Sequence, residues 1–284
     1  MKSFKNKVAV ITGAASGIGK GIAEQCAWLD MKLVLADIDA PALTALEVVL
    51  KERDIEVEAV VTDVSIEADV KNLLKRTVER FGRADLLFNN AGVAAGGPLW
   101  ESSPEDCQWV VDVNLMGMMH CIRAFVPVML DQDSDCHIVN TSSVTGTATY
   151  HPSALYHITK HGILAMSEQL YHDLRLKGAK IGVSVLCPGF VDTRIMDAER
   201  NRPARYRNTV EAASSSPHGE KMEAAFREMI ASGMSPDKVA EITLDAVKND
   251  RFYIFTHPDL MYLARERMNA LMEMKNPILP PFTE

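Results

Sequence analysis

The chain has 284 residues, of which 47% are hydrophobic and 24% are charged, close to an average globular protein. These proportions exclude a disordered chain, a collagen-like chain and a coiled coil, and the length allows one or two domains that need no disulfide or metal for stability. The 30 Lys and Arg residues are outnumbered by 38 Asp and Glu residues, and this net charge of −8 argues against general binding to nucleic acids or anionic membranes.

The N-terminus begins like a signal peptide but does not continue as one. Three lysines precede the apolar run 8–11, which stops at Thr12-Gly13, short of the roughly 7–15 residues of a signal core. No run approaches the ~18 apolar residues of a transmembrane helix. The five scattered cysteines form no C-x-x-C pair, and we interpret them as reduced thiols without a disulfide or a zinc site. The sequence therefore predicts a soluble cytoplasmic protein.

Short apolar runs alternate with longer amphipathic stretches. The runs are rich in Val, Ile and Leu and mostly lack polar alternation, which is typical of strands buried on both faces of a parallel sheet. We predict strands at Val8–Ile11, Lys32–Ala36, Val57–Val61, Leu86–Phe88, His137–Asn140 and Gly182–Leu186. Helices are predicted at about 17–29, 40–53, 66–81, 105–130 and 154–177. These strand–helix units predict an α/β fold: a Rossmann-type doubly wound parallel sheet in a single domain, residues 1–256.

Residues 193–235 interrupt this rhythm. They are polar and contain Ser214-Ser215-Ser216-Pro217 and the arginine cluster Arg200, Arg202, Arg205 and Arg207. We interpret them as a helical excursion that closes over a substrate site. Pro236 suits the first position of a helix at about 236–248, and Arg251–Phe255 resembles a final strand. The tail, residues 257–284, has a helical stretch rich in Met and Leu that we expect to dock on the domain or on a subunit.

A glycine-rich turn follows the first predicted strand, with the spacing G-x-x-x-G-x-G rather than the common G-x-G-x-x-G. Such a turn lets backbone N–H groups approach a pyrophosphate, and the next helix directs its positive end at the phosphates. Glycine also occurs in tight turns for conformational reasons alone. The position at the start of the first βαβ unit favours a dinucleotide site. The expected contacts are Gly13, Ser16, Gly17, Ile18 and Gly19.

Asp37 follows the second predicted strand, 18 residues after Gly19. An acidic residue there can bond the hydroxyls of the adenosine ribose and would repel a 2′-phosphate. Ser16 and Ile38 provide no cation for that phosphate, so the sequence favours NAD over NADP as the coenzyme. The alternative is that Asp37 caps the next helix, a role that Asp39 fills at least as well.

Two further motifs follow the third and fourth strands, Asp63-Val64 and Asn89-Asn90-Ala91-Gly92. Ligands of an open parallel sheet lie beyond the carboxyl ends of its strands, although either motif alone is also compatible with a plain turn. The additional coenzyme contacts predicted here are Asp63, Val64, Asn90, Ala91 and Gly92.

Tyr156 and Lys160 stand one helical turn apart and share a face. Ionising a free tyrosine at pH 7 costs about 4 kcal/mol, which an ammonium, a cationic nicotinamide ring and a hydroxyl donor can together supply. A tyrosinate can then take the proton of an alcohol. Y-x-x-x-K alone also occurs by chance on many surface helices. Ser143, 13 residues before Tyr156, offers a hydroxyl that can hold the substrate oxygen.

In this order, the motifs resemble the short-chain dehydrogenase/reductase family, in its subclass of about 250 residues. The resemblance covers about residues 5–256 and rests on T-G-x-x-x-G-I-G, N-N-A-G, a serine, Y-x-x-x-K and P-G. It implies that Tyr156 is the acid/base, that Ser143 positions the substrate oxygen, and that Lys160 binds the nicotinamide ribose and lowers the tyrosine pKa. It also implies that Asn114 holds a water that relays protons to the lysine. Ser142 is the rival for the serine role, but the family's spacing favours Ser143.

The resemblance also implies contacts and an assembly. The nicotinamide end of the site would be lined by Pro188, Gly189, Val191 and Thr193. A homotetramer or homodimer would form through the helices near 105–130 and 154–177 and the last strand. His157 and His161 have the i,i+4 spacing of metal ligands, but no carboxylate or cysteine completes a set, so we predict no metal.

The substrate pocket should come from segments 94–98 and 145–155, Phe190 and the excursion from Ile195. Its predicted residues are Ala94, Thr145, His151, Leu155 and Phe190. Small and apolar side chains there favour a secondary alcohol or ketone on a terpenoid, steroid-like or aromatic frame. The arginine cluster raises the alternative of an anionic substrate such as a 3-hydroxyacyl-CoA, although a solvated helix face or a subunit contact is the simpler interpretation of these arginines.

Three function classes are compatible with this fold. An NAD-dependent oxidoreductase fits best, because Asn114, Ser143, Tyr156 and Lys160 are all present. An epimerase or dehydratase belongs to longer relatives with a larger C-terminal domain. A non-catalytic NAD-binding sensor would not need this set of residues.

Overall fold

The structure is a computed structural model that describes residues 1–150, 153–208 and 217–278. Within these residues one sheet of seven strands has the order β3-β2-β1-β4-β5-β6-β7, and every neighbouring pair is parallel. The strands are β1 Val8–Thr12, β2 Lys32–Asp37, β3 Val57–Val61, β4 Leu86–Asn89, β5 Cys136–Thr141, β6 Ile181–Cys187 and β7 Tyr253–Phe255. The predicted Rossmann-type fold is confirmed. Most strands extend one residue further than predicted, whereas β7 begins two residues later.

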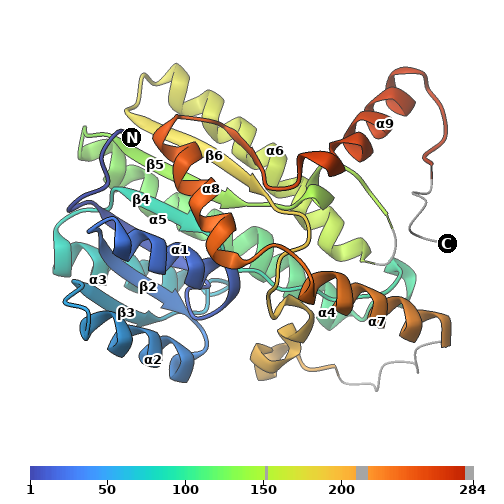
Figure 1. The fold of residues 1–284 in the computed structure, drawn as a ribbon, viewed down its shortest axis with the longest axis horizontal. Coiled ribbons are helices and arrows are strands. Elements are labelled where there is room, and N and C mark those ends of the chain that lie inside the picture. Colours follow the sequence, from blue (N-terminus) through green and yellow to red (C-terminus); the bar gives the residue numbers. More distant parts are fainter. Residues whose placement is uncertain (151–152, 209–216, 279–284) are drawn as a thin grey trace.

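Helices cover both faces of the sheet (Figure 1). The helices of the doubly wound core are α1 Gly17–Trp28, α2 Ala40–Lys51, α3 Glu67–Phe81, α4 Pro104–Val111, α5 Gly117–Asp131, α6 Ala154–Leu176 and α8 Pro236–Lys248. Side chains of α1, α2 and α8 share one apolar cluster, whereas those of α3 to α6 share another. Alternate residues of β1 enter the two clusters: Ala9 joins the first and Val10 the second. Burial on both faces explains why the strands are continuous apolar runs.

The stretch predicted as one helix at 105–130 contains an interruption. A π-helical turn, η2 Asp112–Met116, separates α4 from α5. The whole stretch Pro104–Asp131 is long and apolar enough to cross a membrane, judged by length and composition alone. Its large side chains Trp109 and Phe125 are buried against the sheet. The apolar character therefore belongs to a core helix.

The excursion leaves the sheet after β6 and returns to the same place. The backbone N–H of Asp192 donates to Met234 O at 3.0 Å, and that of Met234 donates to Phe190 O at 3.0 Å. Between these paired ends lie η4 Ile195–Asn201, η5 Ala204–Tyr206 and α7 Pro217–Ala231. The serine run 214–216 lies outside the described residues. Pairing at both ends makes the excursion an insertion into the βαβ pattern, on the side of the molecule where the strands end (Figure 1).

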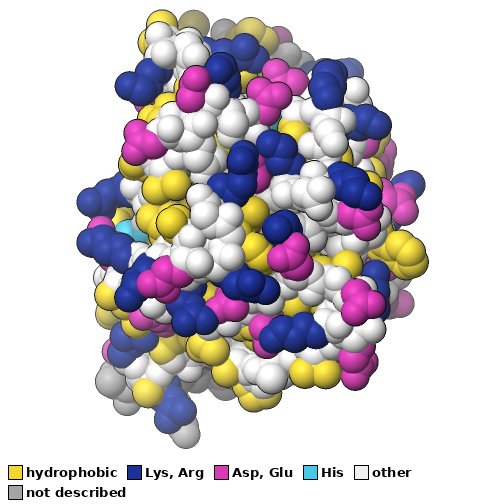
Figure 2. Space-filling model, turned by 90° about the vertical axis from the view of Figure 1, so that its left-hand side faces the viewer, with side chains coloured by type: hydrophobic (Ala, Val, Ile, Leu, Met, Phe, Trp, Pro, Cys, Tyr) yellow, Lys and Arg dark blue, Asp and Glu magenta, His cyan; other side chains and the backbone are white. Residues whose placement is uncertain are grey.

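The chain continues past β7 into η6 Pro258–Leu260 and α9 Met261–Met272. Helix α9 projects from the body of the fold (Figure 1), and within the described chain Leu263 is its buried residue. On the face of the molecule that carries the N-terminus, Lys and Arg side chains are interspersed with Asp and Glu side chains (Figure 2). The described residues of that face therefore form no extended patch of one charge.

Candidate active site

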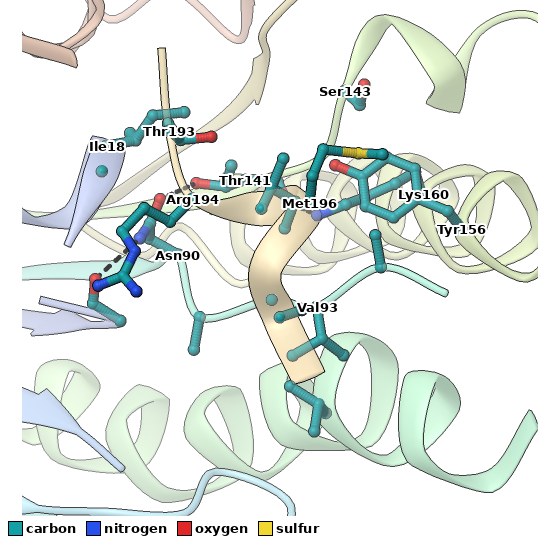
Figure 3. Close-up of a pocket in the computed structure, with 18 of the residues that line it drawn as sticks. Ile18, Asn90, Val93, Thr141, Ser143, Tyr156, Lys160, Thr193, Arg194 and Met196 are labelled. Carbon is teal, nitrogen blue, oxygen red and sulfur yellow. Dashed lines mark hydrogen bonds between the residues drawn. The ribbon is translucent and has the colours of Figure 1, made fainter. Parts of the chain in front are cut away.

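A cavity of about 270 Å³ lies at the carboxyl ends of the strands. It is centred where β1 and β4 are neighbours and the strand order reverses, the position at which open α/β sheets bind their ligands. One end is lined by the glycine-rich turn and Asp37 and the other by Tyr156, while residues of the excursion line both ends. Figure 3 shows Ile18 and Thr193 at one end and Tyr156 with Lys160 at the other.

The glycine-rich turn is locked against the motif that follows β4. Thr12 Oγ1 accepts the backbone N–H groups of Asn90 and Ala91 at 3.0 and 3.1 Å, and Asn90 Nδ2 donates to Thr12 O at 3.2 Å. Gly13 has a φ of 66°, and a Cβ there would lie 2.9 Å from Ala91 Cα. Gly17 has a φ of 51°, so the turn needs glycine at both positions. Bare backbone at the N-terminus of α1 fits the pyrophosphate of a dinucleotide.

The two acidic residues after β2 have different tasks. Asp39 Oδ1 accepts the N–H of Ala42 at 3.2 Å and is the N-cap of α2. Asp37 instead accepts the N–H groups of Ala15 and Asp39, each on a separate oxygen, and lines the cavity. Burial raises the pKa of Asp37 above its ordinary value, while these backbone bonds oppose the rise. The capping interpretation therefore applies to Asp39, and Asp37 retains lone pairs for a ribose.

Tyr156 and Lys160 enter the cavity from the first two turns of α6. Lys160 Nζ donates to Thr141 O at 2.9 Å and lies 5.2 Å from the centroid of the Tyr156 ring. Burial raises the pKa of Tyr156 to about 12, against a smaller lowering by the Ser143 hydroxyl. Burial also lowers the pKa of Lys160 to about 8. Before a coenzyme binds, the site at neutral pH therefore holds a neutral phenol beside an ammonium.

The two candidate serines face in different directions. Ser142 Oγ donates to Lys160 O at 2.7 Å, so its hydroxyl is used to hold α6. Ser143 Oγ donates to Pro188 O at 3.3 Å and accepts the N–H of Thr145 at 3.1 Å. Ser143 is also the serine whose hydroxyl lowers the pKa of Tyr156. This geometry favours Ser143 as the partner of the tyrosine.

Asn114 lies behind the cavity within the π-helical turn. Its Oδ1 accepts the N–H of Val93 at 2.8 Å, and its Nδ2 donates to Val93 O at 2.9 Å. A Cβ on Gly92 would lie 3.4 Å from Asn114 Oδ1 and 3.6 Å from Lys160 Nζ. The amide and the ammonium thus face the same small space, which suits a water between them. Turns of this kind are frequent at functional sites.

Most of the predicted site residues line this one cavity. Those that do are Gly13, Ser16, Gly17, Ile18, Asp37, Asp63, Val64, Asn90, Ala91, Gly92, Ala94, Ser143, Thr145, Tyr156, Lys160, Pro188, Gly189, Phe190, Val191 and Thr193. Gly19 is buried under the turn, where a Cβ would collide with Gly13 O. The structure does not bring Leu155 to the cavity, because its side chain is part of the core. His151 lies outside the described residues.

His157 proves to be a structural histidine. Its Nδ1 donates to Ser153 O at 2.7 Å and its Nε2 accepts the N–H of Tyr150 at 3.2 Å. The ring also packs edge-on against Tyr150, with 4.7 Å between the ring centroids. Both nitrogens are therefore occupied in holding the loop before α6, and Tyr150 of that loop lines the cavity.

Two members of the arginine cluster, Arg202 and Arg205, are paired within the molecule, whereas Arg207 is exposed. Arg202 forms an ion pair with Asp106, its guanidinium lies 4.2 Å from the Trp109 ring centroid, and its side chain is 5% exposed. Arg205 donates to Asp63 Oδ2 at 2.5 Å. The excursion was expected to line the substrate pocket, and Phe226 and Ile230 of its helix α7 do so, although the sequence did not single them out. The sequence carried one signal of the Arg202 contacts, because Asp106 and Trp109 share a face of α4.

The tail contributes one contact to the nicotinamide end. The N–H of Gly189 donates to His257 Nδ1 at 3.2 Å and to Thr256 Oγ1 at 3.3 Å. A Cβ on Gly189 would lie 2.7 Å from the His257 ring. The first residue of the predicted tail thus packs directly on the P-G motif and fixes its backbone.

Fold and cavity together define a dinucleotide-binding α/β protein with a tyrosine, a lysine and a serine beside the coenzyme site. A sequence model of the short chain dehydrogenases matches residues 7–204. The chain is 36% identical to a CLA biosynthesis dehydrogenase/reductase of Lactiplantibacillus plantarum, covering 96% of this chain and 95% of that protein. It is 32% identical to a 1-deoxy-11-beta-hydroxypentalenate dehydrogenase of Streptomyces exfoliatus, covering 98% and 92%.

A solved structure shows the same similarity. The crystal structure of a short chain dehydrogenase/reductase from Burkholderia phymatum in complex with NAD superposes with a TM-score of 0.95, at 45% identity and 99% coverage of both chains. The chain therefore belongs to the short-chain dehydrogenase/reductase family of oxidoreductases. One further relative, 31% identical over 88% of this chain and 94% of its own length, is a diacetyl reductase of Staphylococcus epidermidis that forms (S)-acetoin.

Proposed function

We propose that this protein is an NAD-dependent oxidoreductase that interconverts a secondary alcohol and a ketone on a hydrophobic small molecule. The observation that carries the proposal is the convergence of Ser143, Tyr156 and Lys160 on the cavity that also contains the glycine-rich turn. The carboxylate of Asp37 at the far end supports NAD rather than NADP. The NAD bound to the 45% identical structure supports the same coenzyme.

The proposed mechanism moves one proton and one hydride. In the oxidation direction, the Tyr156 phenolate takes the proton of the substrate hydroxyl, the C–H bond of the same carbon breaks, and a carbonyl forms. When bound, NAD⁺ would supply the hydride acceptor and the positive charge of its nicotinamide ring. Ser143 holds the reacting oxygen against the phenol. Lys160 keeps a positive charge beside the tyrosine, which favours the phenolate over the buried phenol.

Lys160 has N–H donors that are not used within the described part of the protein and are available to the coenzyme and to a water. Its ammonium has three N–H groups, and Thr141 O accepts one of them. The remaining two can serve the nicotinamide ribose and the water proposed at Asn114. The proton taken by Tyr156 can leave along this route, because Asn114 Oδ1 and Lys160 Nζ face the same space beside Gly92.

The substrate end of the cavity is predominantly apolar. Val93 and Val144 line it from the sheet side, while Met196, Phe226 and Ile230 line it from the excursion. The rings of Phe190 and Phe226 meet edge-on, with 6.1 Å between their centroids. This lining supports a terpenoid, steroid-like or aromatic substrate. An anionic substrate has less support, because Arg202 and Arg205 are already paired with Asp106 and Asp63.

The test is the variant Tyr156→Phe, which removes one hydroxyl. Coenzyme reduction would be followed at 340 nm with NAD and with NADP, against secondary alcohols graded by size and charge. We expect turnover to fall by about 10³-fold while NADH binding is retained. Tyr171→Phe is the matched control, since Tyr171 lies on the same helix and packs against Phe252 away from the cavity. Full turnover by Tyr156→Phe would contradict the mechanism.

We also propose a homotetramer or homodimer through α4–α5, α6 and β7. Partly exposed apolar side chains on these elements support this assembly: Met116 is 36% exposed, Ile158 is 52% exposed and Tyr253 on the edge strand is 50% exposed. The molecular mass in solution, measured by light scattering, tests the proposal, and a monomer at micromolar concentration would contradict it.

A further inference from the structure

Residues 194–206, here called the strap, run along the mouth of the cavity. They begin beside the glycine-rich turn, where a Cβ on Gly17 would lie 3.0 Å from Thr193 Cγ2. They end at Tyr206, whose hydroxyl donates to Asp112 Oδ2 at 2.8 Å. The strap therefore links the turn that binds phosphates to the helix that carries Asn114.

Arginines attach the strap to the elements that it passes. Arg202 is buried between Asp106 and the Trp109 ring on α4. Arg205 reaches the turn after β3, where it donates to Asp63 and, at 2.7 Å, to Ser65 Oγ. From the outside, Arg227 of α7 pairs with Asp197 at 2.8 Å. Each of these arginines is matched by at least one carboxylate.

Arg200 differs because no carboxylate forms an ion pair with it among the described residues. Its Nη1 donates to the carbonyl oxygens of Arg194 and Asp197, each at 2.9 Å. Its Nη2 donates to Ser16 Oγ, within the glycine-rich turn, at 3.3 Å. A guanidinium has five N–H donors, so two remain. Figure 3 shows Arg194 between Thr193 and Asn90 at this end of the cavity.

The charges around Arg200 suit an anion. Arg194 and Arg200 line the same cavity as Gly13, Ser16 and Gly17. Burial, and after it the positive charge of Arg194, lowers the pKa of Arg200, while the nearby carboxylates of Asp39, Asp37 and Asp197 oppose this shift. Two neighbouring cations at a turn of bare backbone N–H groups would be stabilised by a diphosphate, because charge-assisted bonds from arginine to phosphate are among the stronger hydrogen bonds.

We propose that Arg200 binds the pyrophosphate of the coenzyme together with the glycine-rich turn, and that the strap thereby holds the coenzyme in the cavity. This inference rests on the proposed NAD dependence. It also revises the expectation that no cation lies near Ser16, because the structure brings one from a segment 184 residues further along the chain.

The experiment measures binding by the full-length protein and needs no substrate. NADH affinity is determined by fluorescence titration, and bound NADH is then displaced with ADP or with adenosine. The variants are Arg200→Ala and Arg200→Lys. Arg207→Ala is the matched control, because Arg207 is an exposed neighbour on the same segment with no side-chain ion pair or hydrogen bond among the described residues.

Arg200→Ala should weaken NADH and ADP binding by about 10- to 100-fold, the loss expected for one hydrogen bond to a charged group. Adenosine, which lacks phosphate, should bind equally to the variant and the wild type. Arg200→Lys should be intermediate, since it keeps the charge but loses the fork of donors. Arg207→Ala should bind all three ligands like the wild type.

Other outcomes overturn the inference. Unchanged NADH affinity in Arg200→Ala would show that Arg200 does not touch the coenzyme. Equal losses for adenosine and ADP would assign Arg200 to shaping the strap rather than to phosphate binding. Wild-type protein that binds neither NADH nor ADP would overturn the proposed coenzyme together with this inference, whereas the other results leave NAD dependence intact.

Discussion

The glycine-rich turn and the strap border the same cavity but are held by different forces. The turn is fixed by backbone geometry: Gly13 lies against Ala91, and Asn90 and Thr12 exchange hydrogen bonds across the ends of β1 and β4. The strap is fixed by ion pairs between its own arginines and carboxylates that are distant in the sequence, above all the pair Arg202–Asp106. One side of the site is therefore rigid by packing, while the other depends on charge.

This difference predicts distinct responses to acid, substitution and salt. Packing in the sheet has little salt dependence, whereas exposed ion pairs weaken as salt is added. The largest expected effect on the unfolding free energy comes from a buried titratable group in the sheet. A steric change in the turn comes next, and the removal of one strap anchor gives the smallest.

His137 on β5 should make the sheet sensitive to acid. Its Nε2 lies 2.8 Å from Ser184 Oγ, which itself donates to Arg251 O, so the imidazole is the donor. Its Nδ1 is buried without a hydrogen-bond partner among the described residues. Burial lowers the pKa of His137 from 6.5 to about 3. Protonation would thus place an unpaired charge inside the sheet.

The sign follows from the lowered pKa. Between pH 3 and 6.5 the unfolded chain binds a proton at His137 that the folded chain does not, so stability falls as the pH falls. At 1.36 kcal/mol per pKa unit, the loss from pH 7 to pH 4 is about 3 kcal/mol. The unfolding free energy can be measured with urea at pH 7 and at pH 4. The decrease between the two pH values should be smaller in His137→Gln than in the wild type by that amount. His172→Gln, on an exposed part of α6, should behave like the wild type, and identical acid losses in all three proteins would contradict the assignment.

Gly19→Ala tests the turn. The added Cβ would collide with Gly13 O and would lie 2.7 Å from Asn90 Nδ2. A backbone carbonyl cannot move away as a flexible side chain can, so we expect a loss of about 3 kcal/mol in unfolding free energy and a large loss of NADH affinity. Gly96→Ala is the control, because a Cβ there meets no atom within 4 Å. Equal stability of the two variants would show that the turn tolerates expansion.

The sequence predicts the turn side of the site well because short-range rules govern it. Glycines after a strand, Asp37 after the next strand and the spacing from Tyr156 to Lys160 all act within one or two elements. Even the choice between Asp37 and Asp39 follows from which residue stands at the N-cap of α2. The strap could not be predicted in the same way, because Arg202 and Asp106 are 96 residues apart and Arg205 and Asp63 are 142 apart.

Other placements depended on packing that no motif encodes. Leu155 adjoins Tyr156, yet it turns into the core while the tyrosine turns toward the cavity. The π-helical turn around Asn114 interrupts a stretch whose apolar pattern resembles one continuous helix. The tail residue His257 contacts Gly189 only because β7 pairs with β6 and brings it there.

Arg202→Ala removes the most buried anchor of the strap and gives the smallest of the three effects. It leaves Asp106 without its arginine partner and exposes the Trp109 ring. We expect this to lower the unfolding free energy by about 2 kcal/mol, because Arg202 is buried while Asp106 still reaches solvent. The variants Arg202→Ala, Asp106→Asn and the double variant form a cycle that isolates the pair. If the pair holds the strap, the double variant loses less stability than the sum of the two single losses. The coupling energy of this buried pair should also decrease less in 1 M salt than the coupling energy of an exposed ion pair does. Additive losses would mean that Arg202 acts through its contact with Trp109 alone, and the strap would then be held by packing, as the turn is.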